Sequence, residues 1–471
     1  LDAPDRQRLE ALLWNPSQHG HVAFVGGPGS GAARALELTV RKLLAGPCDA
    51  HFYVLDATGS FLPFAGAART GAYAGLHELR HAVRILERLV LELARRLSNR
   101  KSPQTPLIVV LAGWGSWASA LRSGPLAWAE DLVHDLARDG AGAGITVLFS
   151  GERELVTARF FGTLPNRFYF PAHSSEETRA LWPRMPAIPS IAGRAVAFGP
   201  VAPGGPAVCQ FYRTQEADPA GGVYSGGPPP SSFPFRVEPL PSKITVQQVA
   251  VLAEAAPQQP PPAQDPSNRG VPASTNQPPR NVCAERQRGV LLGVAGDEPT
   301  AAFLRMPAGG VVAVLGNPGS GKSNLLRAME QLNPAQQWCR PPVLPDVAGD
   351  FWQDMLVLAG KGGISPNTVL LVDDVDVLPQ ATVRALGELD ALGFSLVVTA
   401  AFSPMLIQRV PLMMNARASG AGLLLGPRSM ADGDLFGIRF EVESGAPPGR
   451  AVLVSGGRSF PLQVALAETR Q

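Results

Sequence analysis

Short apolar runs alternate with amphipathic stretches along the whole chain. The longest amphipathic stretch, residues 76–97, has apolar side chains at helical spacing and predicts one long helix. The apolar runs predict buried strands at residues 51–57, 106–114, 145–151, 166–170, 311–316, 368–374 and 395–400. Fully apolar strands separated by helices are typical of a mainly parallel sheet that is covered on both faces.

The two halves of the chain follow one plan. Each half begins with a strand, a glycine-rich loop and a helix, and each ends in the string GRAV, at 193–196 and 449–452. Repetition at a long period indicates tandem domains. The predicted fold class is therefore α/β, with two tandem P-loop NTPase (RecA-like) domains whose mainly parallel sheets are flanked by helices.

A stretch rich in Pro, Gln and Ser separates the halves. Residues 213–281 cannot bury enough apolar surface to offset the entropy of ordering, so we expect a linker there. One apolar patch inside it, 244–253, predicts a short helix. The expected domains are 1–212, a degenerate ATPase-like module, and 282–471, an ATPase module.

Composition narrows the function. The formal net charge of the 471 residues is only +2, which argues against a surface that coats nucleic acid. No apolar run is long enough for a membrane span. The cysteines are scattered, which fits a reducing compartment and argues against a zinc site; they are Cys48, Cys209, Cys283 and Cys339.

The second glycine loop carries a complete phosphate-binding motif, GxxxxGK[ST]. Its backbone N–H groups and the following helix dipole would hold phosphates, Lys322 would contact the β and γ phosphates of ATP, and Ser323 would bind Mg²⁺. The expected nucleotide-binding residues are Gly316, Asn317, Pro318, Gly319, Ser320, Gly321, Lys322, Ser323 and Asn324.

Two carboxylates follow the apolar strand TVLLV and complete this expected site. Asp373 would hold Mg²⁺ through a water molecule, and Asp374 would orient or deprotonate the attacking water. Lys322 and Asp374 are thus the predicted catalytic residues, and Ser323 and Asp373 the predicted metal ligands. Thr399, at the end of the strand 395–400, is either a sensor of the γ-phosphate or a helix cap.

The first glycine loop lacks these groups. Ala32 and Ala33 stand where Lys and Ser or Thr belong, and the strand 106–114 ends without a carboxylate. We therefore expect that the first module does not hydrolyse ATP and binds it weakly or not at all. Asp56 reads as a turn cap, and Trp114 and Trp117 as core residues, with an interaction surface as the alternative.

The tandem loops, the strand ending in DDVD, and the strings LLLGPRSMADGDLFG and PPGR resemble the FtsK/SpoIIIE-type ATPases. Among them the chain is most similar to EccC, the motor ATPase of type VII secretion, over its second and third ATPase domains. HVAFVGGPGSG and the N-terminal LDAP resemble the start of that family's middle ATPase domain, the second of three. The resemblance covers both modules and leaves out the linker.

The resemblance implies a coupling protein that recognises small helical WXG-type proteins and drives their export. It implies other secretion-machine subunits as partners, a homo-hexamer, and a place at the cytoplasmic face of the plasma membrane, with the anchor outside this chain. Two alternatives stay open: a DNA translocase of the same superfamily, against which the balanced charge argues, and a scaffold with structural nucleotide. The GRAV arginines, Arg194 and Arg450, are either arginine fingers or, as we expect, structural residues that begin a strand and pair with a carboxylate.

Overall fold

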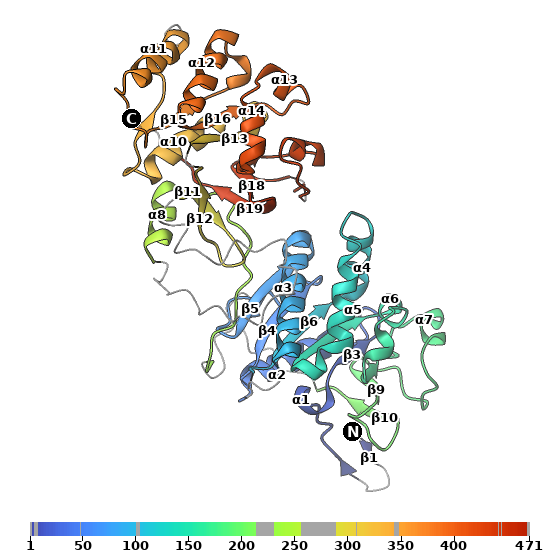
Figure 1. The fold of residues 1–471 in the computed structure, drawn as a ribbon. Coiled ribbons are helices and arrows are strands. Elements are labelled where there is room, and N and C mark those ends of the chain that lie inside the picture. The colour runs from blue at the N-terminus through green and yellow to red at the C-terminus, as the bar shows by residue number, and fades with distance from the viewer. Residues whose placement is uncertain are drawn as a thin grey trace. The chain divides into compact units, whose positions relative to one another are not determined.

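The computed structural model describes residues 2–3, 8–47, 49–99, 104–212, 230–255, 289–307, 309–342, 348–440, 442–443 and 445–468. The chain forms two compact units, Leu1–Glu238 and Pro239–Gln471 (Figure 1). Most of the expected linker, 213–229 and 256–281, lies outside the described residues, as do Cys48 and Cys283. The remaining part of that stretch is divided between the units.

The first unit contains an eight-stranded sheet in the order β10-β9-β8-β3-β7-β6-β4-β5. Apart from it, β1 (Asp2–Ala3) pairs with β2 (Arg8–Leu9). The central strands are buried along their length because helices cover both faces. The bounds of the sheet strands are β3 Val22–Val25, β4 His51–Asp56, β5 Thr70–Gly75, β6 Leu107–Ala112, β7 Ile145–Gly151, β8 Asn166–Tyr169, β9 Arg194–Phe198 and β10 Ala207–Gln210.

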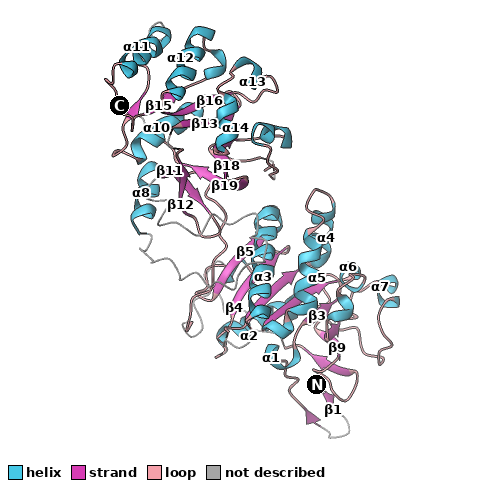
Figure 2. Ribbon diagram, in the orientation of Figure 1, coloured by secondary structure: helices cyan, strands magenta, loops and turns pink. Residues whose placement is uncertain are grey.

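Alternate side chains of these strands enter two cores, one on each face. Phe24, Val54 and Val110 pack with α2, whereas Val25 and Leu55 pack with α3, α4 and α5. Figure 2 shows these helices and the strands between them. This is the period-two alternation of a strand between two helical layers. The helices are α1 Pro16–His19, α2 Ala32–Ala45, α3 Leu79–Ser98, α4 Trp114–Arg122, α5 Ala129–Asp139, α6 Arg153–Val156 and α7 Glu176–Ala180.

The second unit contains a nine-stranded sheet in the order β12-β11-β19-β18-β17-β13-β16-β15-β14. The helix α10 covers one face, and α11 to α14 cover the other. The strands are β11 Gly289–Ala295, β12 Thr300–Arg305, β13 Gly310–Gly316, β14 Trp338–Cys339, β15 Val369–Val372, β16 Ser395–Ala400, β17 Gly422–Leu425, β18 Arg450–Ser455 and β19 Arg458–Val464. The helices are α8 Val246–Ala255, α10 Lys322–Leu332, α11 Ala348–Gly360, α12 Gln380–Ala391, α13 Leu406–Arg409 and α14 Met413–Ser419.

Both sheets contain parallel and antiparallel pairings, so the expectation of mainly parallel sheets holds only in part. The strands beside the glycine loops are parallel, but β8, β9 and β10 pair antiparallel. In the second sheet every pairing from β17 through β18, β19 and β11 to β12 is antiparallel. Short connections join β9 to β10, β11 to β12 and β18 to β19, and antiparallel neighbours need no helical crossover.

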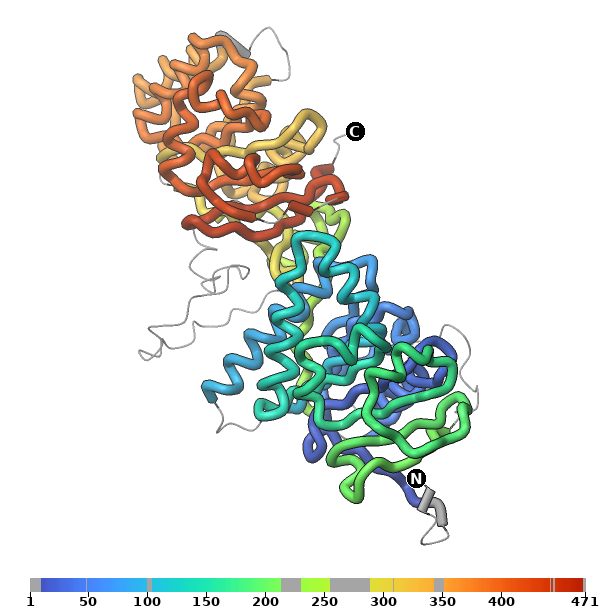
Figure 3. The backbone as a smooth tube through the Cα atoms, turned by 90° about the vertical axis from the view of Figure 1, so that its right-hand side faces the viewer, coloured from blue at the N-terminus to red at the C-terminus, as the bar shows by residue number. Residues whose placement is uncertain are grey.

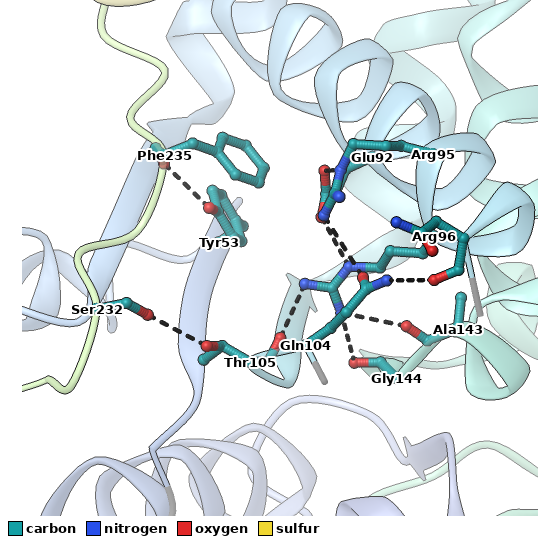
Figure 4. A network of polar contacts seen from close by, with 11 residues as sticks. Tyr53, Glu92, Arg95, Arg96, Gln104, Thr105, Ala143, Gly144, Ser232 and Phe235 are labelled. Carbon is teal, nitrogen blue, oxygen red and sulfur yellow. Dashed lines mark hydrogen bonds and ion pairs between the residues drawn. The ribbon is translucent and has the colours of Figure 1, made fainter. Parts of the chain in front are cut away.

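A segment of the expected linker, residues 230–238, lies against the first unit (Figure 4). The ring of Phe235 stacks on that of Tyr53 with centroids 4.5 Å apart, and the Tyr53 hydroxyl donates to the Phe235 carbonyl at 3.0 Å. Val237 is buried, and its carbonyl lies 2.8 Å from Nε2 of His81. This segment is therefore part of the first unit's packed surface.

The predicted helix at 244–253 is present as α8, but it packs on the second unit. Ile244 and Val249 enter a core with Ala328 of α10 and Ala465. The amide N–H of Leu466 donates to the Ile244 carbonyl at 2.8 Å, so the chain's last described residues lie beside the start of α8 (Figure 3). Among the residues that the structure describes, no helix combines the length and apolar composition that a bilayer crossing requires.

Candidate functional site

The loop that follows β13 forms an open cradle at the start of α10. Gly319 and Gly321 have φ angles of 78° and 99°, a region that glycine enters without steric cost. A Cβ added at either position would meet no described atom within 4 Å. The loop therefore leaves space beside its backbone at the positive end of the α10 dipole, where an anion is stabilised.

Lys322 lies across the base of this cradle. Its side chain is 8% exposed, and its ammonium group donates to the Gly316 carbonyl at 2.9 Å. The same nitrogen lies 3.2 Å from Oδ1 of Asp374. A buried ammonium needs such acceptors because desolvation of an unpaired charge is costly. The two predicted catalytic residues are thus in direct contact.

The two predicted metal ligands are also in contact. The hydroxyl of Ser323 donates to Oδ2 of Asp373 at 2.5 Å. These side chains come from the first turn of α10 and the end of β15, which the parallel pairing of β13, β16 and β15 brings to one edge of the sheet. A hydroxyl that donates its proton to a carboxylate still has lone pairs for a cation.

Thr399 contacts both aspartates, one through its carboxylate and the other through its backbone. Its hydroxyl donates to Oδ1 of Asp373 at 2.6 Å and accepts the amide N–H of Asp374 at 2.8 Å. The side chain is fully buried at the end of β16. The sequence predicts a sensor or a cap at Thr399 and does not reveal this double contact. The available signal was a hydroxyl at the end of the strand beside the glycine loop.

Asp374 has an unusual backbone. Its φ and ψ are 47° and 54°, and it is one of two described non-glycine residues with positive φ. Left-handed backbone costs an ordinary L-residue roughly 1–2 kcal/mol. The turn is held by the hydrogen bond to Thr399, and it keeps the carboxylate of Asp374 next to Lys322.

The side chain of Asn324 lies elsewhere. Its amide donates to the Ala465 carbonyl at 3.1 Å and accepts the N–H of Ala467 at 3.0 Å. It was expected among the nucleotide-binding residues. Because the side chain is bonded to the C-terminal segment, any contribution of Asn324 to phosphate binding comes from its backbone.

The first unit has a loop of the same shape. Gly29 and Gly31 have φ angles of 79° and 99°, which match Gly319 and Gly321 within one degree. Ala32 and Ala33 begin α2, where α10 has Lys322 and Ser323. The conformation of this loop is therefore retained without the residues that would contact phosphate and metal.

Strand register identifies the counterparts of the other site residues. Ser150 pairs with Phe24, two residues before the first loop, and Thr399 pairs with Val314, two residues before the second. By the same register Ala112 and Gly113 match Asp373 and Asp374. The first unit thus keeps one hydroxyl of the network and neither carboxylate.

Arg450 pairs with a carboxylate, as expected of a structural arginine, whereas Arg194 pairs with a side-chain amide. Arg450 Nε lies 3.0 Å from a carboxylate oxygen of Glu443, and its guanidinium donates to the Leu240 carbonyl at 3.2 Å. Arg194 donates to Gln210 at 3.1 Å. Each arginine begins a strand and is bonded within its own unit.

The remaining singled-out residues of the first unit are also structural. Trp114 and Trp117 are buried in the core, and their rings do not form a surface. Asp56 accepts the amide N–H groups of Thr58 and Phe61 at 2.9 and 2.8 Å. It is therefore the cap of the turn that follows β4.

The sequence matches no protein-family model and no curated protein. Solved structures do share the fold. EssC (ATPases 2 and 3) from Geobacillus thermodenitrificans matches with a TM-score of 0.65 at 15% identity, over 99% of this chain and 95% of that one. The Thermomonospora curvata EccC (ATPases 2 and 3), in complex with a signal sequence peptide, matches with a TM-score of 0.56 at 18% identity, over 97% and 90%.

The cytoplasmic domain of the type VII secretion ATPase EccC from T. curvata matches with a TM-score of 0.58 at 18% identity. The match covers 99% of this chain but 59% of that domain, so the chain spans less than two thirds of it. The resemblance to EccC noted in the sequence is confirmed: the chain has the fold of the EccC and EssC ATPase domains.

Proposed function

We propose that this chain is the ATP-binding and ATP-hydrolysing part of a type VII secretion-like motor, and that only its second unit responds to nucleotide. One observation carries the proposal. An open glycine loop stands next to a joined set of four side chains, Lys322, Ser323, Asp373 and Asp374, on the fold of the EccC and EssC ATPases. These are the groups that phosphoryl transfer to water requires.

The residues present fit a magnesium ion. Ser323 and Asp373 would hold it, because their oxygens already lie 2.5 Å apart and hard oxygen donors suit this cation. When bound with ATP, the ion would neutralise charge on the β and γ phosphates. Thr399 keeps Asp373 in place by donating to its other oxygen at 2.6 Å.

Lys322 and Asp374 would exchange partners when nucleotide binds. Without phosphate, the ammonium group is paired with Asp374 at 3.2 Å. A triphosphate in the cradle offers Lys322 a stronger anionic partner, which frees the carboxylate of Asp374 to accept a proton from water. Asp374 is 49% exposed, so water reaches it.

The first unit has no counterpart of this chemistry in our proposal. Its loop begins α2 with Ala32 and Ala33, and Ala112 and Gly113 stand at the carboxylate positions. Without an ammonium group, a hydroxyl ligand and two carboxylates, it neither hydrolyses ATP nor binds it at micromolar concentration. It serves as a retained scaffold or contact surface.

The proposed cargo is a small helical WXG-type secreted protein. The support is the shared fold with EccC, one of whose structures is a complex with a signal sequence peptide. Other secretion-machine subunits and further copies of the chain, as a homo-hexamer, are the proposed partners. The proposed location is the cytoplasmic face of the plasma membrane.

Steady-state ATP turnover tests the enzymatic part. The whole chain, with Mg²⁺ and with candidate helical cargo, should turn over ATP, and the Lys322→Ala chain should lose about 100-fold or more in kcat/KM. Equal rates for the two chains would contradict the proposal and favour a scaffold with structural nucleotide. Stimulation of turnover by DNA in a salt-dependent manner would instead favour a DNA translocase.

A further inference from the structure

The glycine loop of the first unit is filled by the chain's own residues. In the second unit, Cβ atoms added at Gly319 and Gly321 would meet no described atom within 4 Å. At the matching positions of the first unit, Gly29 lies against the ring of His173 and Gly31 against the backbone of Gly193. Two loops with the same backbone therefore differ in what occupies the adjoining space.

The carboxylate of Glu152 lies against Gly27, the second residue of the first loop. A Cβ added at Gly27 would be 2.9 Å from Oε1 of Glu152. Glu152 directly follows β7, and the register places Ala401 at this position in the second unit. A negative charge thus stands beside the loop whose open counterpart is suited to an anion, and it would repel a triphosphate.

The segment that follows β8 supplies two further contacts. The amide N–H of Gly27 donates to the hydroxyl of Ser174 at 3.4 Å, and this hydroxyl donates to the Phe170 carbonyl at 3.1 Å. The preceding residue, His173, has a φ of 59°, and its ring would be 3.4 Å from a Cβ at Gly29. An unusual backbone at a bulky residue persists only where its surroundings hold it.

The turn before β9 completes the set. The amide N–H of Gly193 donates to the Ser30 carbonyl at 2.8 Å. A Cβ at Gly31 would lie 2.5 Å from the nitrogen of Gly193, so the two backbones are in close contact. Gly449, the matching residue of the second unit, has nearly the same φ, 80° against 79°. It is not among the atoms near Gly321.

We propose that the first loop is a self-occupied cradle, in which Glu152, Ser174 and Gly193 take the places that phosphate would need. The inference rests on the proposal that the first unit does not bind nucleotide. It adds a second cause for this lack of binding, beyond the missing Lys and Ser. The loop's present role is to join the ends of β7 and β8 to the turn before β9. Restoring Lys and Ser alone does not restore nucleotide binding.

The test uses the whole chain with Lys322→Ala, so that the second loop contributes little binding. A fluorescent ATP analogue with Mg²⁺ is titrated into four chains: this parent, the parent with Ala32→Lys and Ala33→Ser, and that chain with Glu152→Gln or with Glu152→Ala. The first two should show no micromolar binding. Removal of the Glu152 charge should tighten binding at least about tenfold relative to the Lys-Ser chain.

Glu154→Ala in the Lys-Ser chain is the matched control. Glu154 is two residues further on, and its carboxylate lies against Gly115 rather than against the loop. This control should not tighten binding. Thermal unfolding of each chain establishes that it is folded, and Glu152→Gln preserves side-chain size if Glu152→Ala unfolds the unit.

The outcomes separate the two proposals. Micromolar binding by the parent would contradict the proposal that the first unit does not bind ATP. If the Lys-Ser chain binds as tightly as the chains that also carry a Glu152 substitution, the natural first unit is still unable to bind ATP. The proposal of a self-occupied cradle would then be wrong. Equal tightening by Glu154→Ala and Glu152→Gln would also overturn it, because a general change of charge would then suffice.

Discussion

Asp374 and Gly113 occupy the same left-handed turn in the two sheets. Their φ and ψ angles are 47° and 54° for Asp374 and 74° and 53° for Gly113. In each unit the amide N–H at this position donates to a hydroxyl of the neighbouring strand, from Asp374 to Thr399 at 2.8 Å and from Gly113 to Ser150 at 3.0 Å. The turn therefore belongs to the fold, and only the second unit places a carboxylate on it.

The first prediction concerns the stability lost by placing a residue with a Cβ at this left-handed turn. Asp374→Gly and Asp374→Ala both remove the ion pair with Lys322 and should both abolish ATP turnover. The Ala variant still has a Cβ at positive φ, so its free energy of unfolding should be about 1 kcal/mol below that of the Gly variant. Urea denaturation of the two chains measures this difference. An Ala variant at least as stable as the Gly variant would refute the left-handed turn.

The second prediction separates the two hydrogen bonds of Thr399. In Thr399→Val the shape is kept, but Asp373 loses a donor and the N–H of Asp374 loses its acceptor. We expect a loss of about 1–3 kcal/mol in the free energy of unfolding from the buried N–H, and a fall in kcat at least about tenfold with little change in the dissociation constant for ATP.

Thr399→Ser is the matched control, because it keeps the hydroxyl. It should recover most of the turnover. Ser150→Val in the first unit removes only the bond to the Gly113 amide, so it should lower stability and leave ATP turnover unchanged. A fall in turnover with Ser150→Val as large as that with Thr399→Val would mean that the effect is a general loss of folding.

The third prediction is a pH dependence in the first unit. Burial lowers the pKa of His21 from 6.5 to about 4. The unfolded chain therefore binds a proton between these values and the folded chain does not. The stability that neutral His21 allows is present above about pH 6.5 and is lost as the pH falls toward 4, by about 3 kcal/mol in total.

The measurement compares unfolding of the natural chain with that of His21→Asn, whose side-chain oxygen can still accept the Val147 N–H that His21 Nδ1 accepts at 2.9 Å. Carboxylates titrate in both chains, so the informative quantity is the difference in slope. The natural chain should lose more stability between pH 6.5 and 4. Parallel curves would contradict a buried, neutral His21.

The fourth prediction concerns a buried ion pair on α3. Arg96 is 5% exposed; its guanidinium donates to Glu92 at 2.8 Å and to the carbonyls of Thr105 and Ala143 (Figure 4). Burial acts to raise the pKa of Glu92, but hydrogen bonds from Arg95 and Arg96 lower it below the ordinary value. The pair thus holds α3 to the loops on either side.

Arg96→Met should cost about 3–5 kcal/mol of unfolding free energy, because Glu92 is left buried with less compensation. Arg95→Met is the control: that side chain is 57% exposed and also pairs with Glu92, yet we expect a loss of at most about 1 kcal/mol. Chemical denaturation of both variants compares them. Equal losses would mean that burial of the pair contributes little.

The sequence predicts best what lies beside the two glycine loops. Strands such as 395–400 were predicted because a run of apolar residues is required where helices cover both faces of a sheet. The glycine-loop motif itself implies a strand before it and a helix after it. The antiparallel edges were missed. The parallel edge strands β5, with the sequence TGAYAG, and β14, of two residues, were missed as well, because they carry too little apolar pattern to be recognised alone.

The contacts between the site residues are harder to predict from the sequence. The spacing of Ser323 and Asp373 along the chain, fifty residues, does not reveal a 2.5 Å hydrogen bond, which depends on the register of three parallel strands. The occupation of the first loop by Glu152 and His173 was equally hidden. Both residues come from connections after strands, where the path of the chain is decided by tertiary packing.

The position of α8 matters for anyone who wishes to prepare the second unit alone. Leu240, Ile244 and Val249 share a core with Leu291, Val294 and Ala328, the last of these on the helix that begins at Lys322. A fragment cut at residue 282, where the sequence alone would place the boundary, lacks one side of that core and exposes an apolar face prone to aggregation. A fragment beginning at Pro239 keeps it covered and is the better choice for crystallisation or calorimetry.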